Sequence, residues 1–273
     1  MILEFPQWGG VFPRLHPGLN LNTMSTDLQS IGMNFPQWQD AVEAAIATDR
    51  LTVTGEVRGG QLIQYSDDSG AQINILAVEP FATFAGFASI TKCFAHISMI
   101  DDVLALCQVI DYNDQEVALL TLNLAQGPLL IDEPEQRWQE LGVTALAFDV
   151  TTYPSVEAFE QATGSTPGTF SSAGAQVIMS GDGSKVPDAA ATFSARVLSA
   201  GVRTNALTSE DFVHVTVDGG FPYDVCMPMS AGVPERGSVI AGRAVMTGFV
   251  AAPAGGGCGG GSCGSGGCGC GGH

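Results

Sequence analysis

Apolar and polar residues alternate along two long parts of the chain, residues 51–124 and 191–249, and this pattern limits the fold more than any other feature of the sequence. A period of two places successive side chains on opposite faces of a β-strand, so that one face is buried and the other meets water. The pattern is interrupted by residue pairs that are typical of tight hairpin turns, Gly59-Gly60, Asn113-Asp114 and Gly219-Gly220. The sequence therefore predicts an α+β protein that is predominantly antiparallel β.

Helical spacing of apolar residues is confined to short segments. It predicts three helices, over residues 37–49, 134–141 and 155–163. The first is indicated by Trp38, Val42 and either Ala45 or Ile46, which recur at helical spacing just after a proline. Residues 164–190 are rich in Gly, Ser, Thr and Pro and are expected to form a loop, apart from the apolar run 175–179.

The strand-rich parts are expected to form one or two small sandwich-like or barrel-like units. Residues 87–97 and 103–110 are predicted to be buried strands, and an OB-like or SH3-like barrel is expected for residues 190–250. There the last strand contains Gly242 and Gly248, and glycine inside a strand often marks a bulge or a barrel corner. The expected segments are an irregular N-terminal segment (1–33, with residues 1–23 readable as an over-extended gene start), a helix plus β-rich domain (34–131), a helix–strand–helix and loop connector (132–190), a second β-rich domain (191–252) and a flexible Gly/Cys-rich tail (253–273).

The charge balance limits the partners of the chain. It carries 10 Lys plus Arg against 28 Asp plus Glu, a formal net charge of −18. Tight binding to phosphates requires clustered cations, so nucleic acid and anionic membrane surfaces are unlikely partners. No run of 18 uncharged apolar residues is present, so the sequence predicts no transmembrane helix. The partners left open are an unknown protein or small molecule.

We expect negligible affinity for DNA or RNA at physiological salt, because too few cations are available to release counterions from the phosphates. Fluorescence anisotropy with labelled single-stranded and double-stranded oligonucleotides measures this directly. A sub-micromolar affinity would show that a local patch, Arg196, Arg203 and Arg243, outweighs the net charge.

The sequence contains no motif of the common metalloprotease, nucleotide-binding or serine-hydrolase types. Ser89 and Lys92 match the S-x-x-K spacing, and Cys93 and His96 are a thiol and an imidazole three residues apart. Both pairs lie in the predicted strand 87–97, where residues three apart point to opposite faces. No S-x-x-K function is therefore expected of Ser89 and Lys92, and core packing is the expected role of Cys93 and His96 and of the strand residues Cys107 and Cys226. His214 is expected to be a hydrogen-bonded strand residue rather than a ligand. The chain is predicted to be non-enzymatic.

The C-terminal segment carries specific chemistry. Residues 255–272 consist of twelve glycines, four cysteines and two serines, followed by His273. Without apolar side chains this segment cannot join a core, and it is expected to be disordered when free. Four thiolates, or three thiolates and an imidazole, complete a tetrahedral zinc shell, and Cu(I) or an iron–sulfur cluster suits the same soft ligands. The predicted metal ligands are Cys258, Cys263, Cys268, Cys270 and His273, with four of the five binding at once.

Two resemblances concern this segment. The sequence Cys268-Gly269-Cys270-Gly271 resembles the C-terminal C-G-C-G of A-type iron–sulfur carrier proteins, over these four residues only. The mixture of Gly, Ser and Cys is also similar to the core of thiazole- and oxazole-modified microcins, which are short precursors. Zinc is the metal that these residues are expected to bind, with Cu(I) and an iron–sulfur cluster as the alternatives.

Cysteine usage predicts the compartment. Seven cysteines are an odd number, three of them stand singly in predicted strands, and the first residues lack the basic and apolar regions of a signal peptide. A disulfide framework is therefore not expected, and the reducing cytoplasm is the predicted location. The predicted function is that of a soluble cytoplasmic protein whose C-terminal thiolates bind a soft metal ion. The alternative is a β-barrel module that binds a protein or a small ligand and whose tail is incidental.

Overall fold

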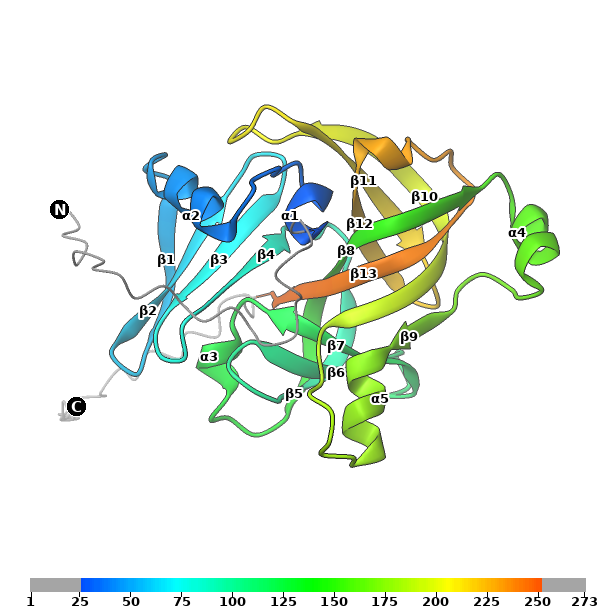
Figure 1. Cartoon of the computed structure of the whole chain (residues 1–273). Coiled ribbons are helices and arrows are strands. Elements are labelled where there is room, and N and C mark those ends of the chain that lie inside the picture. Colours follow the sequence, from blue (N-terminus) through cyan, green and yellow to red (C-terminus); the bar gives the residue numbers. More distant parts are fainter. Residues whose placement is uncertain (1–25, 252–273) are drawn as a thin grey trace, which may run out of the picture.

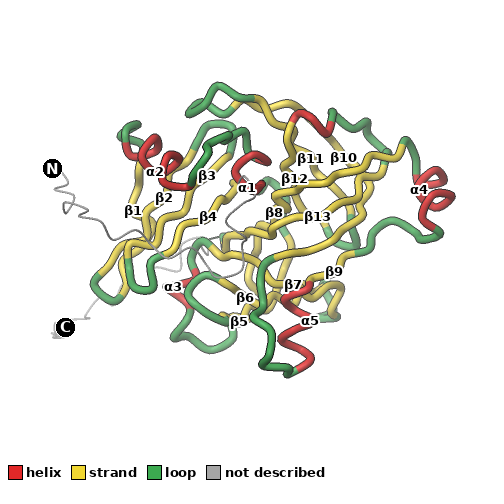
Figure 2. Tube along the Cα trace, viewed as in Figure 1, coloured by secondary structure: helices red, strands yellow, loops and turns green. Residues whose placement is uncertain are grey.

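The computed structural model describes residues 26–251 and confirms a predominantly antiparallel β protein with a few short helices (Figures 1 and 2). The described strands form one four-stranded sheet and one nine-stranded sheet. The four-stranded sheet lies at one end of the molecule and the larger sheet curls beside it (Figure 1).

The four-stranded sheet is an antiparallel meander in the order β1-β2-β3-β4. Its strands are β1 (Leu51–Val57), β2 (Gly60–Ser66), β3 (Ala71–Ala77) and β4 (Ala82–Phe87). Two helices, α1 (Thr26–Ser30) and α2 (Trp38–Ile46), supply part of the core on one of its faces. That core also contains Leu146, Phe212 and Cys226 from the large sheet, so the small sheet is packed onto the outside of the large one.

The remaining strands form the nine-stranded sheet in the order β11-β12-β8-β5-β6-β7-β13-β10-β9. Its strands are β5 (Cys93–Met99), β6 (Leu104–Ile110), β7 (Glu116–Leu124), β8 (Gln136–Tyr153), β9 (Phe170–Ser172), β10 (Ala190–Thr204), β11 (Asp211–Asp218), β12 (Pro222–Pro228) and β13 (Val239–Val250). The short helices between them are α3 (Gly127–Leu130), α4 (Val156–Thr163), α5 (Ala173–Ser180) and a 3-10 turn, η1 (Met229–Ala231).

Two additional pairings close this sheet into two rings of strands. Because β10 pairs with both β11 and β13, the strands β10, β11, β12, β8 and β13 form a closed ring. The strands β8, β5, β6, β7 and β13 form a second ring, closed by the parallel pairing of β7 with β13. Both rings use β8 and β13, so this antiparallel ribbon is the common wall of two small barrels.

One hydrophobic core fills both rings. It combines inward-facing residues of β5, β6 and β7, among them Ile97 and Leu120, with those of β10 to β13, among them Val215 and Met246. Residues of β8 such as Val143 belong to the same cluster. The alternation that predicted the strands from the sequence therefore separates this shared core from the outer faces.

Strand β8 is bulged twice. At the first bulge, Arg137 and Trp138 together oppose His96 of β5. At the second, Asp149 and Val150 together oppose Gly242 of β13. Trp138 and Asp149 have φ angles of 53° and 52°. Bulges bend a strand and increase its twist, which lets one strand run through both rings.

Three expectations about local structure need correction. Residues 134–141 do not form a helix, because residues 136–141 pair with β5 as the start of β8, and this pairing overrides their helical spacing. Residues 87–97 are not one strand, because a turn at 88–92 separates β4 from β5. Residues 164–190 are not only loop, because they contain β9 and α5. The Ser172 hydroxyl caps the start of α5, and Gly181 ends the helix in the left-handed conformation. The predicted helices at 37–49 and 155–163 are confirmed as α2 and α4.

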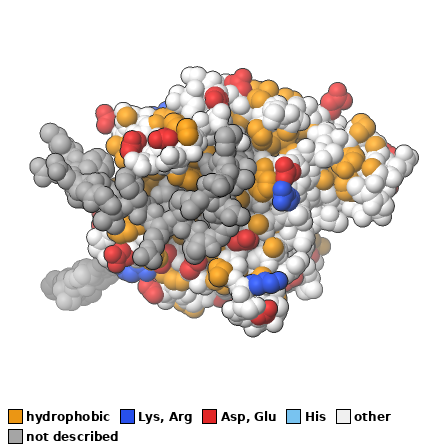
Figure 3. Space-filling model, viewed as in Figure 1, with side chains coloured by type: hydrophobic (Ala, Val, Ile, Leu, Met, Phe, Trp, Pro, Cys, Tyr) orange, Lys and Arg blue, Asp and Glu red, His pale blue; other side chains and the backbone are white. Residues whose placement is uncertain are grey.

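Most arginines among the described residues pair with an aspartate. On the face shown in Figure 3, Lys and Arg form only a few separate spots. The arginine–aspartate pairs are Arg50–Asp68, Arg58–Asp102, Arg137–Asp114, Arg196–Asp218 and Arg243–Asp149. Within residues 26–251, no helix has the length and apolarity that a bilayer crossing requires.

One ion pair joins the two sheets. Arg58, in the turn between β1 and β2, contacts Asp102, in the turn between β5 and β6. The Asp102 side chain is only 12% exposed, whereas that of Asp68, which pairs with Arg50 on the surface, is 87% exposed. We expect Asp102→Asn to lower the free energy of unfolding by about 1–2 kcal/mol and Asp68→Asn by less than about 0.5 kcal/mol, because water screens the second pair more strongly than the first. Urea unfolding of both variants measures the difference, and equal losses would contradict it.

Candidate functional site

The predicted metal ligands Cys258, Cys263, Cys268, Cys270 and His273 all lie outside the described residues. Residues 26–251 contain no group of three or more His, Cys, Asp or Glu side chains placed to hold a metal ion. The structure therefore leaves the predicted site untested and shows no competing site in the part that it describes.

The cysteines within the described residues are Cys93, Cys107 and Cys226, and all three are buried and unpaired. Burial raises the pKa of the Cys93 thiol to about 12 and raises the pKa values of Cys107 and Cys226 as well. These thiols stay protonated at neutral pH, so they are poor metal ligands and poor nucleophiles. Their predicted role in core packing is confirmed.

A buried carboxylate lies where β4 and β5 meet the β11–β12 hairpin. Asp224 of β12 is completely buried. Its Oδ1 lies 2.6 Å from Nε2 of His214, on the neighbouring strand β11. Its Oδ2 accepts hydrogen bonds from the Thr91 backbone N–H at 2.9 Å, from the Thr91 hydroxyl at 2.7 Å and from the Ser89 hydroxyl. His214 stacks on Phe87, with ring centroids 5.0 Å apart.

These contacts keep Asp224 ionised. Burial raises the pKa of this carboxyl, but the hydrogen bonds from His214, Ser89 and Thr91 outweigh burial and hold the pKa below its usual value. The residue types are those of a serine-hydrolase triad, but the order differs, because the carboxylate lies between the hydroxyl and the imidazole. His214 therefore has no contact through which to activate Ser89. The network is structural, and it fixes the turn at residues 88–92 against the barrel.

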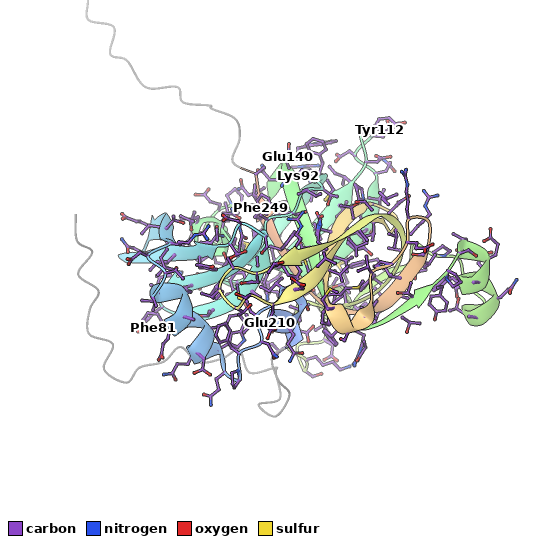
Figure 4. The ribbon with its side chains drawn as sticks, turned by 90° about the horizontal axis from the view of Figure 1, so that it is seen from above. Phe81, Lys92, Tyr112, Glu140, Glu210 and Phe249 are labelled. Carbon is purple, nitrogen blue, oxygen red and sulfur yellow. The ribbon has the colours of Figure 1, made fainter. Side chains whose placement is uncertain are left out.

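This turn places Lys92 over an aromatic ring. The Lys92 Nζ lies 3.7 Å from the centroid of Phe249 and donates to the Ser89 carbonyl at 3.2 Å. Gly142 lies between the two side chains, and a Cβ there would come within 2.6 Å of Phe249 and 3.0 Å of the Lys92 Nζ. Glu140 is near Lys92 on the same side of the molecule (Figure 4). Burial lowers the pKa of Lys92, and the charges of Glu140 and Asp224 partly oppose that effect. Lys92 does not contact the Ser89 hydroxyl, so no S-x-x-K site exists here.

His96 fixes the first bulge of β8. Its Nδ1 accepts the backbone N–H of Trp138 at 3.1 Å, and its Nε2 lies 2.8 Å from Oδ1 of Asp114, in the β6–β7 turn. Since Nδ1 is an acceptor, the ring proton is on Nε2, where it is donated to Asp114. Nδ1 of this buried imidazole therefore holds the Trp138 backbone, and the contact of Nε2 with Asp114 fixes the orientation of the ring. As expected from the sequence, Cys93 belongs to the core and His96 lies on the other face of β5.

The conformation of Trp138 is unusual. Within residues 26–251 it is the only aromatic residue at a positive φ, and glycine normally fills the left-handed position of such a bulge. A side chain there costs about 1 kcal/mol or more. The ring nevertheless remains 44% exposed and lies beside Phe94, which is 49% exposed, with ring centroids 6.3 Å apart.

No family model matches the chain, and no curated protein shows significant similarity to it.

Sequence reasoning missed the two clusters around Asp224 and Trp138. Asp224 and Ser89 are 135 residues apart, and no spacing along the chain indicates that they meet. The spacing of residues 134–141 predicts a helix, and a helical pattern gives no sign of the bulge at Trp138. One signal was present, since a lone acidic residue in the apolar run 223–227 requires buried hydrogen-bond donors.

Proposed function

We propose that this chain is a non-enzymatic cytoplasmic protein that binds one soft metal ion through its C-terminal thiolates, and that this ion is zinc rather than Cu(I) or iron. One observation carries the proposal: Cys258, Cys263, Cys268, Cys270 and His273 fall within sixteen residues that contain no apolar side chain. These are the residue types of structural zinc sites. Glycine between them imposes little steric cost, so four of the five ligands can reach one ion.

The chemistry of the described cysteines supports this assignment. Cys93, Cys107 and Cys226 are separately buried with raised pKa values, so they do not compete for a thiophilic ion. They are also unpaired, which agrees with a reducing compartment.

The position of the last described residues supports a separation between metal site and fold. Strand β13 pairs with β8 through Val250, and the Ala251 N–H donates to the Glu140 carbonyl at 2.9 Å. Each described strand therefore finds its partners among residues 26–251. The proposed metal site is therefore not needed to close either ring of strands.

Elemental analysis of the full chain, purified without oxygen and without added metal, tests the proposal. About one equivalent of zinc, or of copper or iron, is expected per chain. Binding is expected to tighten as pH rises, because the thiols must lose protons before they bind the metal. A metal-free protein that also fails to take up Zn(II) or Cu(I) at micromolar concentration would overturn the proposal.

A further inference from the structure

The exposed aromatic pair on the second barrel, Phe94 and Trp138, is held in place by specific contacts. Trp138 adopts a conformation that favours glycine, and the buried His96 holds its backbone N–H. The His96 and Trp138 rings also meet edge to face, with centroids 5.8 Å apart. Strained residues held by their surroundings cluster at binding and catalytic sites, because the strain fixes a side chain in the orientation that the ligand needs.

The rings stand on the outer face of the sheet formed by β8, β5, β6 and β7. Phe94 pairs with Glu140 on β8 and with Ile110 on β6, and His96 pairs with Gln108. Cross-strand partners share one face of a sheet, so polar side chains flank the rings. We call this the Phe94–Trp138 surface; it consists of Phe94, Trp138, Gln108, Glu116, Arg137 and Glu140.

The charges on this surface already have partners. The Arg137 guanidinium lies 3.4 Å from Oδ2 of Asp114, and the Gln108 amide donates to Glu116 at 3.0 Å. Glu140 lies near the Lys92 ammonium (Figure 4). An anionic ligand would meet Glu116 and Glu140 on this surface and Asp114 beside it, and a cationic ligand would meet Arg137 on it and Lys92 beside it. Charge complementarity therefore favours an uncharged partner.

We propose that the Phe94–Trp138 surface binds a neutral oligosaccharide. The C–H bonds on one face of a sugar ring carry partial positive charge, and they complement the negative face of an aromatic ring. The sugar hydroxyls both donate and accept hydrogen bonds, so they can use the acceptor and donor capacity that the paired carboxylates, amide and guanidinium retain. Such flanking polar groups fix the orientation of a ligand. This site is independent of the C-terminal cysteines.

Titration of the full chain with neutral hexasaccharides of glucose, xylose, mannose and N-acetylglucosamine tests the proposal by isothermal calorimetry. At least one of them is expected to bind with a dissociation constant below about 1 mM. Phe94→Ala and Trp138→Ala should each weaken binding about tenfold or more, because truncating an aromatic anchor removes its whole contact surface. Trp138→Phe keeps a ring in place and should bind within about threefold of the parent chain.

Val186→Ala is the control, because Val186 is an apolar residue, 73% exposed, on the loop after α5 and away from the rings, and this variant should bind sugar as the parent chain does. Saturation-transfer NMR provides a second readout. The C–H protons on one face of the sugar ring should receive saturation from the parent chain, and they should receive none from Trp138→Ala. Circular dichroism confirms that each variant is folded.

Three results would overturn the proposal. The first is the absence of binding by all four sugars at 10 mM, a concentration far above that of a specific weak complex. The second is binding that Phe94→Ala and Trp138→Ala leave unchanged. The third is binding of tetramethylammonium, or a change of oligomeric mass in Trp138→Ala, without any binding of sugar; those outcomes would assign the surface to a cation or to another protein.

Discussion

Removing residues 255–273 is expected to abolish metal uptake and to leave the melting temperature within about 2 °C of that of the full chain. A structural zinc finger obtains roughly 10 kcal/mol or more from its ion, because the metal organises its core. Here the described barrels have their own core and complete strand pairing without these residues, so little of the metal-binding energy should reach the barrels. Inductively coupled plasma mass spectrometry gives the metal content, and scanning calorimetry gives the melting temperature.

Replacing Cys258, Cys263, Cys268 and Cys270 with serine keeps the length of the segment and should abolish uptake equally. Cys107→Ala is the control, because it removes a thiol from the core and should leave the metal content unchanged. If the truncated chain kept its full metal content, the ligands would lie elsewhere and the proposed function would be wrong.

Asp224→Ala is expected to lower the free energy of unfolding by roughly 4 kcal/mol, a large part of the stability of a typical domain. The substitution leaves the donors of His214, Ser89 and Thr91 buried without their acceptor, and it also opens a cavity. Asp68→Ala is the matched control: its carboxylate pairs with Arg50 on the surface, and the loss should stay below about 1 kcal/mol. Urea unfolding followed by circular dichroism measures both losses, and a loss of less than 1 kcal/mol for Asp224→Ala would show that the network carries little energy.

The same carboxylate gives the chain a defined acid sensitivity. Because the pKa of Asp224 is lower in the folded state than in the unfolded state, its contribution to stability is fully present above about pH 4. That contribution is lost as the pH falls through the folded pKa, when the carboxyl becomes protonated. The stability difference between the parent chain and Asp224→Asn should therefore be largest at neutral pH and should narrow below pH 4. A difference that stayed constant down to pH 3 would mean that another interaction dominates.

The elements that were predicted correctly are those whose local sequence agrees with their final surroundings. Helix α2 has an apolar face, and α4 has the Ser155 cap and ends at Gly164 with a φ of 72°. Strand β11 alternates between Val213, Val215 and Val217, which face the barrel core, and residues on its opposite face, which the small sheet and the turn at 88–92 help to bury. In these cases local propensity and tertiary packing favour the same structure.

The failures arise where long-range pairing decides. Residues 136–141 contain good helix formers, yet pairing with β5 and β13 makes them a strand. The turn at Ser89 is stabilised by Asp224, a residue 135 positions away, so no local pattern marks it. The same reason explains the missed site residues: the bulge at Trp138 depends on His96 across the sheet, and period and spacing carry no information about such partners.

The ribbon shared by β8 and β13 has a consequence for synthesis. Residue 153 leaves the ribosome long before residue 239, so β8 waits for its partner while β5, β6 and β7 already present an apolar face. Neither ring can close until β13 has emerged, because that strand is the last member of both. The nascent chain therefore exposes unpaired strand edges for most of its translation, and chaperones that shield such edges would act on it until nearly all of residues 26–251 have been made. A ribosome stalled before Val239 would release a product that lacks both barrels, whereas one stalled just after Ala251 would release a folded body.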